Sequence, residues 1–213
     1  MKINTILFDL DGVLIDSNRI WAELHQKTAR LLKLRVPAYK EISNLWGESW
    51  DYIIGMLWPN TNKQKFKETL YGIKKKENIL LPPVRNVTKT LKELKELGYN
   101  LGIVTACPKA AVIKDLKEAG IDFEFFKIIV SAEDTENHKP NPEPILHACD
   151  LFNVKPENAI YVGDSLFDYK SAKSANTVFV AVLTGDVKEE EFRENGVKNI
   201  IDSVAELPKF LKL

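Results

Sequence analysis

The sequence predicts an α/β fold in which a doubly wound parallel sheet carries an inserted all-helical segment. Short apolar runs of strand length alternate with helical patterns over most of the 213 residues. These runs are almost continuously apolar, which is typical of parallel strands that helices cover on both faces. Residues 17–81 break the alternation because they show helical spacing and no convincing strand.

The chain begins with one strand and then enters the helical insert. Ile3–Phe8 is apolar and β-branched, which predicts a buried strand. Ser17 is expected to cap the first of three helices, since serine is a favoured N-cap residue. Apolar residues at helical spacing mark these helices: Ile20, Trp21, Leu24, Leu31 and Leu32, then Trp50, Ile53, Ile54 and Leu57, then Phe66, Leu70 and Ile73. Pro82–Pro83 is predicted to be a stiff linker that leads back to the alternating pattern. We therefore predict a core of residues 1–16 and 82–213 and a helical domain of residues 17–81.

The alternating pattern resumes after the two prolines. Five more strands are predicted: Leu101–Thr105, Lys127–Ser131, Ala159–Gly163, Val178–Val182 and Asn199–Ile201. Apolar residues three or four apart predict helices before Gly98 and before Gly120, because glycine often follows the last turn of a helix. A third helix is predicted to begin at Pro142, since proline suits the first helical turn.

Composition excludes several classes of protein. The chain has 30 Lys plus Arg and 30 Asp plus Glu, so binding of nucleic acid through bulk charge is not expected. No apolar run is long enough to span a membrane, and acids follow the first short apolar run, unlike a signal peptide. With only Cys107 and Cys149, reduced thiols in a cytoplasmic protein are the simpler interpretation, although one disulfide is conceivable.

Polar side chains gather where the predicted strands end. Asp9 and Asp11 follow the first strand, Thr105 ends the second, Lys139 follows the third, and Asp164 follows the fourth. In an open parallel sheet, ligands bind beyond the carboxyl ends of the strands. Acids, a hydroxyl and an ammonium at one edge predict a site for a divalent metal and an anionic substrate.

These residues resemble the four motifs of the haloacid dehalogenase superfamily, in its phosphatase branch. The motifs are Asp9-Leu10-Asp11-Gly12-Val13-Leu14, then Thr105, then Lys139, then Gly163-Asp164-Ser165 with Asp168. The match implies a Rossmann-like core. The insert resembles the small cap of the phosphoglycolate phosphatase and β-phosphoglucomutase subfamily.

The resemblance implies a role for each motif residue. Asp9 would be the nucleophile that forms an aspartyl-phosphate. Asp11 would be the general acid and then the general base, which favours alkyl phosphate esters over haloacids. Lys139 would hold Asp9 and a phosphoryl oxygen, and Thr105 with the backbone N–H of Ala106 would bind the phosphoryl group.

The resemblance also implies Mg²⁺, which prefers hard oxygen ligands. Its ligands would be Asp9, the backbone carbonyl of Asp11, and Asp164. Asp168 would support Lys139 or metal-bound water, or would simply favour the first turn of a helix. The partner would be a small phosphorylated metabolite, and nothing in the sequence indicates the oligomeric state.

The cap offers weaker candidates. Gly47, Glu48 and Ser49 form a loop that would help to select the substrate, or would be ordinary loop and helix-capping residues. Trp21 and Trp46 would pack the small helical domain or line a substrate cavity. The mutases of this subfamily carry a histidine near the position of Trp21, so its absence argues against a phosphomutase.

Three functions stay open at this point: a Mg²⁺-dependent phosphatase, a phosphomutase, and a non-catalytic phosphate-binding module. The intact motifs argue against the third. Residues 17–81 contain 12 Lys plus Arg and 6 Asp plus Glu, whereas the remaining residues contain 18 and 24. A basic cap over an acidic core would attract an anionic substrate, unless residues 63–76 are only a solvated helix face.

Overall fold

A six-stranded parallel sheet forms the centre of the computed structural model, which describes residues 3–212. The strands are β1 (Thr5–Phe8), β2 (Asn100–Val104), β3 (Ile128–Val130), β4 (Ala159–Gly163), β5 (Val178–Val182) and β6 (Ile200–Ile201). Their order is β3-β2-β1-β4-β5-β6, and every neighbouring pair is parallel. All six predicted strands and the predicted fold class are thus confirmed. From β1 the chain adds β2 and β3 on one side of the sheet and then β4, β5 and β6 on the other. A ligand site is expected at the end of β1, because the direction of the connections changes there.

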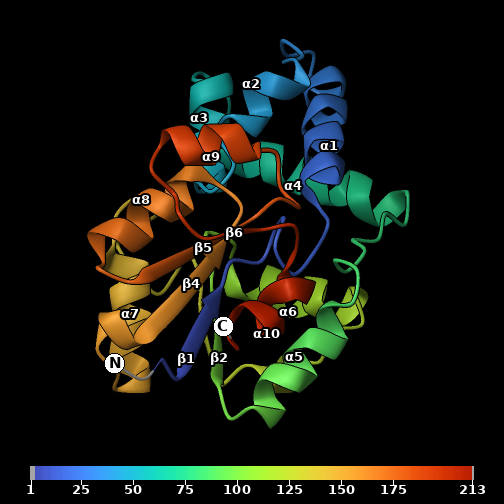
Figure 1. Ribbon diagram of the computed structural model, residues 1–213. Helices are drawn as coiled ribbons and strands as arrows, with labels where there is room; N and C mark the ends of the chain where they lie inside the picture. Colours follow the sequence, from blue (N-terminus) through green and yellow to red (C-terminus); the bar gives the residue numbers. More distant parts are fainter. Residues whose placement is uncertain (1–2, 213) are drawn as a thin grey trace.

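Helices cover both faces of the sheet (Figure 1). On one face lie α5 (Val87–Glu96), α6 (Lys109–Glu118) and α10 (Leu207–Phe210), and on the other lie α7 (Glu143–Phe152), α8 (Leu166–Ser174) and α9 (Glu189–Glu194). Side chains of a strand alternate between the faces. Ile6 and Phe8 accordingly pack with the first group, and Leu7 packs with the second. Burial on both faces explains why the strands are apolar at nearly every position.

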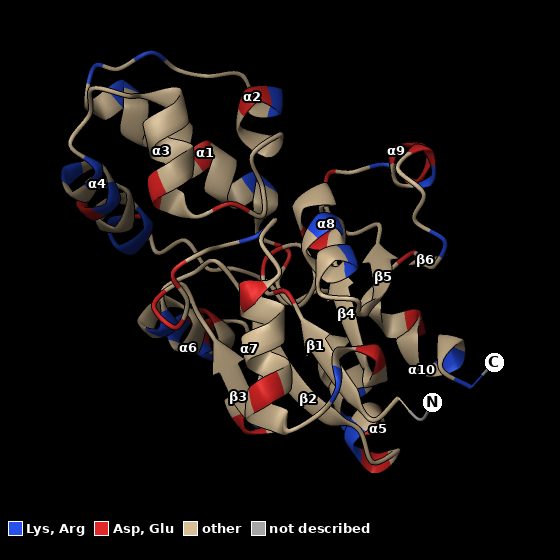
Figure 2. Ribbon diagram, turned by 90° about the vertical axis from the view of Figure 1, so that its left-hand side faces the viewer, with Lys and Arg blue, Asp and Glu red and all other residues tan. Residues whose placement is uncertain are grey.

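Four helices form a cap over the carboxyl ends of the strands (Figures 1 and 2). They are α1 (Asn18–Leu31), α2 (Tyr39–Ser43), α3 (Trp50–Leu57) and α4 (Lys63–Lys76). The apolar spacing predicted three of them, but α2 has only five residues, too few to produce a periodic signal. Leu31 belongs to the apolar spacing of the first helix, but it is 65% exposed and is the last residue of α1. The exact limits of the domain, residues 17 and 81, stay a prediction.

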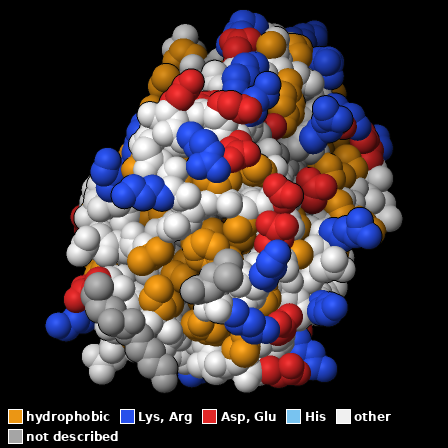
Figure 3. All heavy atoms as spheres, viewed as in Figure 1, with side chains coloured by type: hydrophobic (Ala, Val, Ile, Leu, Met, Phe, Trp, Pro, Cys, Tyr) orange, Lys and Arg blue, Asp and Glu red, His pale blue; other side chains and the backbone are white. Residues whose placement is uncertain are grey.

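The basic residues of the cap lie mostly on its outer surface. Lys63, Lys65, Lys75 and Lys76 of α4 are exposed, and both signs of charge are interspersed on the face drawn in Figure 3. Lys74 is the exception, because it is buried and forms ion pairs with α6. Its Nζ lies 3.1 Å from Asp115 Oδ1 and 2.5 Å from Glu118 Oε2. This cluster fastens α4 of the cap to α6 of the core.

Two expectations from composition can be compared with the fold. Within residues 3–212, every helix is too short or too polar to cross a lipid bilayer. Cys107 and Cys149 are both buried, and each is a free thiol in the structure.

Candidate active site

Asp9 lies at the carboxyl end of β1, directly under the cap. It follows a strand whose four residues are all buried, and its backbone N–H donates to Val162 O of β4 at 2.9 Å. Asp9 is only 5% exposed, and its Oδ2 lies 2.9 Å from Lys139 Nζ. The sheet therefore holds the predicted nucleophile next to the predicted lysine, at the point where the direction of the strand connections changes.

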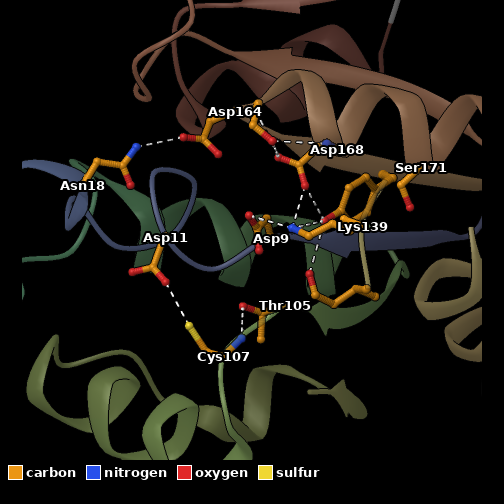
Figure 4. A network of polar contacts seen from close by, with 12 residues as sticks. Asp9, Asp11, Asn18, Thr105, Cys107, Lys139, Asp164, Asp168 and Ser171 are labelled. Atoms are coloured by element: carbon orange, nitrogen blue, oxygen red, sulfur yellow. Dashed lines mark hydrogen bonds and ion pairs between the residues drawn. The ribbon is translucent and has the colours of Figure 1, made fainter. Parts of the chain in front are cut away.

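Lys139 is held by two carboxylates and a phenol (Figure 4). Its Nζ donates to Asp168 Oδ1 at 2.6 Å and to Tyr161 OH at 3.1 Å, besides its ion pair with Asp9. Burial lowers the pKa of Lys139, but the charges of Asp168 and Asp9 outweigh this effect and raise it well above its usual value. The ammonium group therefore stays charged and fixed in position.

Asp168 is positioned by the start of α8. Ser165 is the N-cap of α8 and forms a capping box, in which its hydroxyl accepts from the backbone N–H of Asp168. Asp168 Oδ2 in turn accepts from the backbone N–H and the hydroxyl of Ser165 at 3.1 and 2.6 Å. Both interpretations of Asp168 therefore apply, because it stabilises the helix start and also binds Lys139.

Asp164 follows β4 and faces a narrow space. A Cβ atom at Gly12 or at Gly185 would lie 2.1 or 2.0 Å from its Oδ2, so only glycine leaves room for the carboxylate at either position. Asn18 of α1 donates its Nδ2–H to the same oxygen at 3.0 Å. The cap is thus bonded to the predicted metal ligand.

Asp11 receives hydrogen bonds from both the cap and the core. Its Oδ1 accepts from Trp21 Nε1 of α1 at 2.9 Å and from Ser17 Oγ. Its Oδ2 accepts from the thiol of Cys107 at 3.2 Å.

Ser17 does precede α1, but its side chain makes no capping hydrogen bond, so the prediction that it caps the helix is wrong. Its hydroxyl binds Asp11 instead of a backbone amide.

Thr105 faces the same cavity from the end of β2. Its backbone N–H donates to Val130 O at 3.0 Å, and its hydroxyl oxygen accepts from the backbone N–H of Cys107 at 3.2 Å. The hydroxyl hydrogen is therefore free to be donated to a ligand. Ala106 follows it in the cavity wall, as the motif implied.

The cavity between cap and core has a volume of about 40 Å³. Its wall consists of Asp9, Asp11, Asn18, Trp21, Trp46, Gly47, Glu48, Trp50, Ile53, Thr105, Ala106, Cys107, Lys139 and Asp164. Trp21 and Trp46 therefore line a cavity, the less expected of their two interpretations. Ser49 is absent from this wall. Its side chain instead caps α3 by accepting from Tyr52 N.

The cap loop packs tightly on the core. Gly47 has φ +99°, and a Cβ there would lie 2.8 Å from Ser165 Oγ and 2.9 Å from Phe167 Cβ. A second contact joins the cap to the loop after β5. Asp186 accepts hydrogen bonds from Tyr39 OH at 2.5 Å and from Trp46 Nε1 at 2.8 Å. With this closure, the cavity admits only small groups.

The buried carboxylates suit a divalent cation. Ligand atoms of Asp9, Asp164 and Asp168 lie within 4.8 Å of one another, but both oxygens of Asp168 already accept hydrogen bonds. Burial raises the pKa of Asp9 to about 7, against the opposing charge of Lys139, and raises that of Asp164 well above its usual range. Three buried acids with one lysine leave an excess of negative charge, which a bound cation would offset. Asp9 and Asp164 have the oxygen chemistry for this role.

Comparisons with known proteins agree with this geometry. Residues 6–182 match the family model described as "Haloacid dehalogenase-like hydrolase". The chain is 32% identical over 186 residues to "Pyrophosphatase PpaX" of Bacillus cereus (strain B4264), covering 85% of this chain and 84% of that protein.

Solved structures have the same fold. A predicted phosphoglycolate phosphatase from Haemophilus somnus 129pt has a TM-score of 0.82 and 25% identity, covering 99% of both chains. A β-phosphoglucomutase from Clostridium difficile has a TM-score of 0.81 and 22% identity, covering 99% of this chain and 96% of that one.

The fold and the buried site define a hydrolase whose Rossmann-like core carries a helical cap. The chain belongs to the haloacid dehalogenase-like hydrolase family, in its phosphatase branch, and is an enzyme.

Three polar contacts of the site have no clear signal in the sequence. Asn18 binds Asp164, Tyr161 binds Lys139, and Asp186 binds the cap loop. Tyr161 lies inside the apolar strand β4, where the sequence pattern predicts burial but no polar contact. Asn18 and Asp186 are ordinary residues of a helix start and a loop, and only the packing of the cap on the core brings them to the site.

Proposed function

We propose that the enzyme hydrolyses a small-molecule phosphate monoester, with Mg²⁺, through an aspartyl-phosphate on Asp9. The observation that carries this proposal is the buried Asp9–Lys139 ion pair at the end of β1, inside a closed cavity with excess acidic charge. Mg²⁺, held by Asp9, Asp164 and the backbone carbonyl of Asp11, would neutralise phosphoryl oxygens and so favour attack by a carboxylate.

The first step is phosphoryl transfer to the protein. A carboxylate oxygen of Asp9 forms a bond to phosphorus as the bond from phosphorus to the leaving oxygen breaks. Lys139, the Thr105 hydroxyl and the backbone N–H of Ala106 bind the phosphoryl oxygens and stabilise the charge on them. Asp11 donates its proton to the leaving oxygen, which departs as an alcohol.

The second step releases phosphate. Asp11, now a carboxylate, removes a proton from a water molecule whose oxygen attacks phosphorus. The bond between phosphorus and Asp9 breaks, so the carboxylate is regenerated and inorganic phosphate leaves. The closed cap excludes bulk water during the first step and has to open to exchange alcohol for water.

Phosphate release from p-nitrophenyl phosphate with Mg²⁺ tests this function. The Asp9→Asn variant is expected to lose activity by about 10³-fold or more, because an amide cannot accept the phosphoryl group. It should stay folded, as measured by circular dichroism, since an amide fits the space of the carboxylate. Asp150→Asn, at an exposed position of α7, is the matched control and should keep full activity.

Two results would contradict the proposal. An active Asp9→Asn enzyme would exclude the covalent step. Conversion of a hexose 1-phosphate to its 6-phosphate without phosphate release would identify a phosphomutase instead.

A further inference from the structure

The cap side of the cavity contains an acid without a partner among the described residues. Glu48 lies in the cap loop and lines the cavity, where it is partly buried. Among residues 3–212, no hydrogen bond or ion pair engages its carboxylate. Burial raises the pKa of Glu48, and the positive charge of Lys139 acts against this effect. The charge of Lys139 therefore acts on Glu48, but Glu48 has no ion-pair partner of its own among the described residues.

Positive charge is missing from the cap side of the cavity. Lys139 is the only cation among the described lining residues, and its ammonium is already bound by Asp9 and Asp168. The surplus lysines of the cap lie on its outer surface, apart from Lys74, which is paired with α6. A leaving group with a second negative charge would meet Glu48 with nothing to compensate the repulsion.

Aromatic carbon forms most of the remaining wall on this side. The indole N–H of Trp21 is bonded to Asp11, and that of Trp46 is bonded to Asp186. These two side chains therefore offer the cavity only the carbon surface of their rings. Trp50 packs edge-to-face with Trp21, with ring centroids 4.8 Å apart. Indole rings attract ammonium groups through their quadrupole and have no comparable attraction for anions.

We infer that the substrate is the phosphate monoester of a small amino alcohol, whose ammonium group lies against Glu48 and the indole rings. This inference rests on the proposed phosphatase function and adds the chemical class of its leaving group. The closed cavity is small, which favours a short leaving group, so 2-aminoethyl phosphate is the probe of choice. The class differs from phosphoglycolate and pyrophosphate, after which two of the similar proteins are named and whose leaving groups are anionic.

Three substrates of nearly equal size test the inference. They are 2-aminoethyl phosphate, 2-hydroxyethyl phosphate and phosphoglycolate, which place a positive, neutral or negative group at the same distance from phosphorus. With Mg²⁺ at neutral pH, kcat/KM should fall in that order, with the first at least about 10-fold above the second. Pyrophosphate should be poorer than 2-aminoethyl phosphate as well.

Variants of Glu48 give a second readout. In Glu48→Gln, the ratio of kcat/KM for 2-aminoethyl phosphate to that for 2-hydroxyethyl phosphate should fall about 10-fold. Glu48→Lys should reverse the order and favour phosphoglycolate. Glu68→Gln, on the exposed face of α4, is the matched control and should keep the wild-type ratio.

The outcomes separate this inference from the proposed function. If p-nitrophenyl phosphate is hydrolysed but the three substrates react equally, or phosphoglycolate or pyrophosphate reacts fastest, the inference is wrong and the phosphatase function stands. An unchanged ratio in Glu48→Gln would also overturn it. If no substrate, including p-nitrophenyl phosphate, releases phosphate, the proposed function fails and the inference fails with it.

Discussion

Three hydrogen bonds hold the Asp11 carboxylate in a fixed orientation. Trp21 reaches it from α1, whereas Ser17 and Cys107 come from the hinge before α1 and from the loop after β2. A general acid must point at the leaving oxygen to transfer its proton. Through Trp21, closure of the cap can therefore orient the acid, which makes Trp21 a positioning residue.

Trp21→Phe should impair reactions that need the acid and spare those that do not. An alkoxide leaves only with a proton, whereas p-nitrophenolate leaves without one. We expect kcat/KM for 2-hydroxyethyl phosphate, which reports the first step, to fall about 10-fold, because one of the hydrogen bonds that orient Asp11 is lost. The value of kcat/KM for p-nitrophenyl phosphate should change less than about 2-fold, since its first step needs no acid.

Trp58→Phe is the control for this prediction. Trp58 also lies in the cap, but its indole N–H donates to Arg35 O at 2.7 Å, away from Asp11. Both substrates should react at close to the wild-type rate in this variant. An equal fall for both substrates in Trp21→Phe would show that the indole merely stabilises the cap.

Helix α1 carries a buried histidine at the centre of the cap. The His25 ring lies within 6.3 Å, centroid to centroid, of Trp46, Trp50, Trp58 and Phe66. Its Nδ1 lies 2.8 Å from Trp21 O, so the ring N–H donates there. Its Nε2 is buried without a partner among the described residues. Burial lowers the pKa of His25 to about 4, so the folded cap holds the ring neutral.

Stability should therefore fall when the pH drops from 6.5 towards 4. In that range the unfolded chain binds a proton at His25 that the folded protein does not, which favours unfolding. The full loss at pH 4 is about 3 kcal/mol of unfolding free energy. Urea unfolding at pH 7 and pH 4.5 measures it, and His25→Phe should lose less stability between these values than the wild type.

His147→Gln serves as the comparison, because His147 is partly exposed on α7. Its pH dependence should equal that of the wild type. If His25→Phe and the wild type lose the same stability on acidification, His25 is protonated without cost in the folded cap and the prediction is wrong.

Acidic and basic residues occupy different parts of the molecule. In Figure 2, acidic segments lie between the cap and the ends of the strands, and basic turns of α4 lie on the outside. Of the two interpretations of the basic cap, the solvated helix face agrees with the exposed lysines of α4, and the cavity wall has no basic residue from the cap among the described residues. Lys139 is the one cation that faces the acids of the site among the described lining residues, so an excess of negative charge is left there.

A divalent cation should therefore stabilise the whole protein. At a Mg²⁺ concentration 100 times its dissociation constant, the unfolding free energy should rise by about 2.7 kcal/mol, and EDTA should reverse the gain. In Asp164→Asn the response to Mg²⁺ should vanish. Without metal, this variant should be more stable than the wild type, because a buried charge next to Asp9 and Asp168 is removed.

Thermal unfolding with Mg²⁺ or EDTA measures these differences. Asp202→Asn, at an exposed position after β6, should respond to Mg²⁺ as the wild type does. A wild-type melting temperature that is the same with Mg²⁺ and with EDTA would argue against a metal site at Asp9 and Asp164.

Local patterns in the amino-acid sequence predict the sheet, three of the four cap helices and the order of the motif residues. Strands buried on both faces are apolar throughout, and long helices repeat their apolar residues every three to four positions, so both leave local patterns. Parallel strands also bring their ends to one edge, which is why Asp9, Thr105, Lys139 and Asp164 could be expected to meet there.

How the cap completes the site could not be predicted before the packing of cap and core was known. The contacts of Asn18 with Asp164 and of Asp186 with Trp46 join residues more than a hundred positions apart. They depend on how the cap packs on the core, which no local periodicity encodes. The same packing decides that Glu48 faces the cavity without a partner, and with it the charge that the leaving group of the substrate should carry.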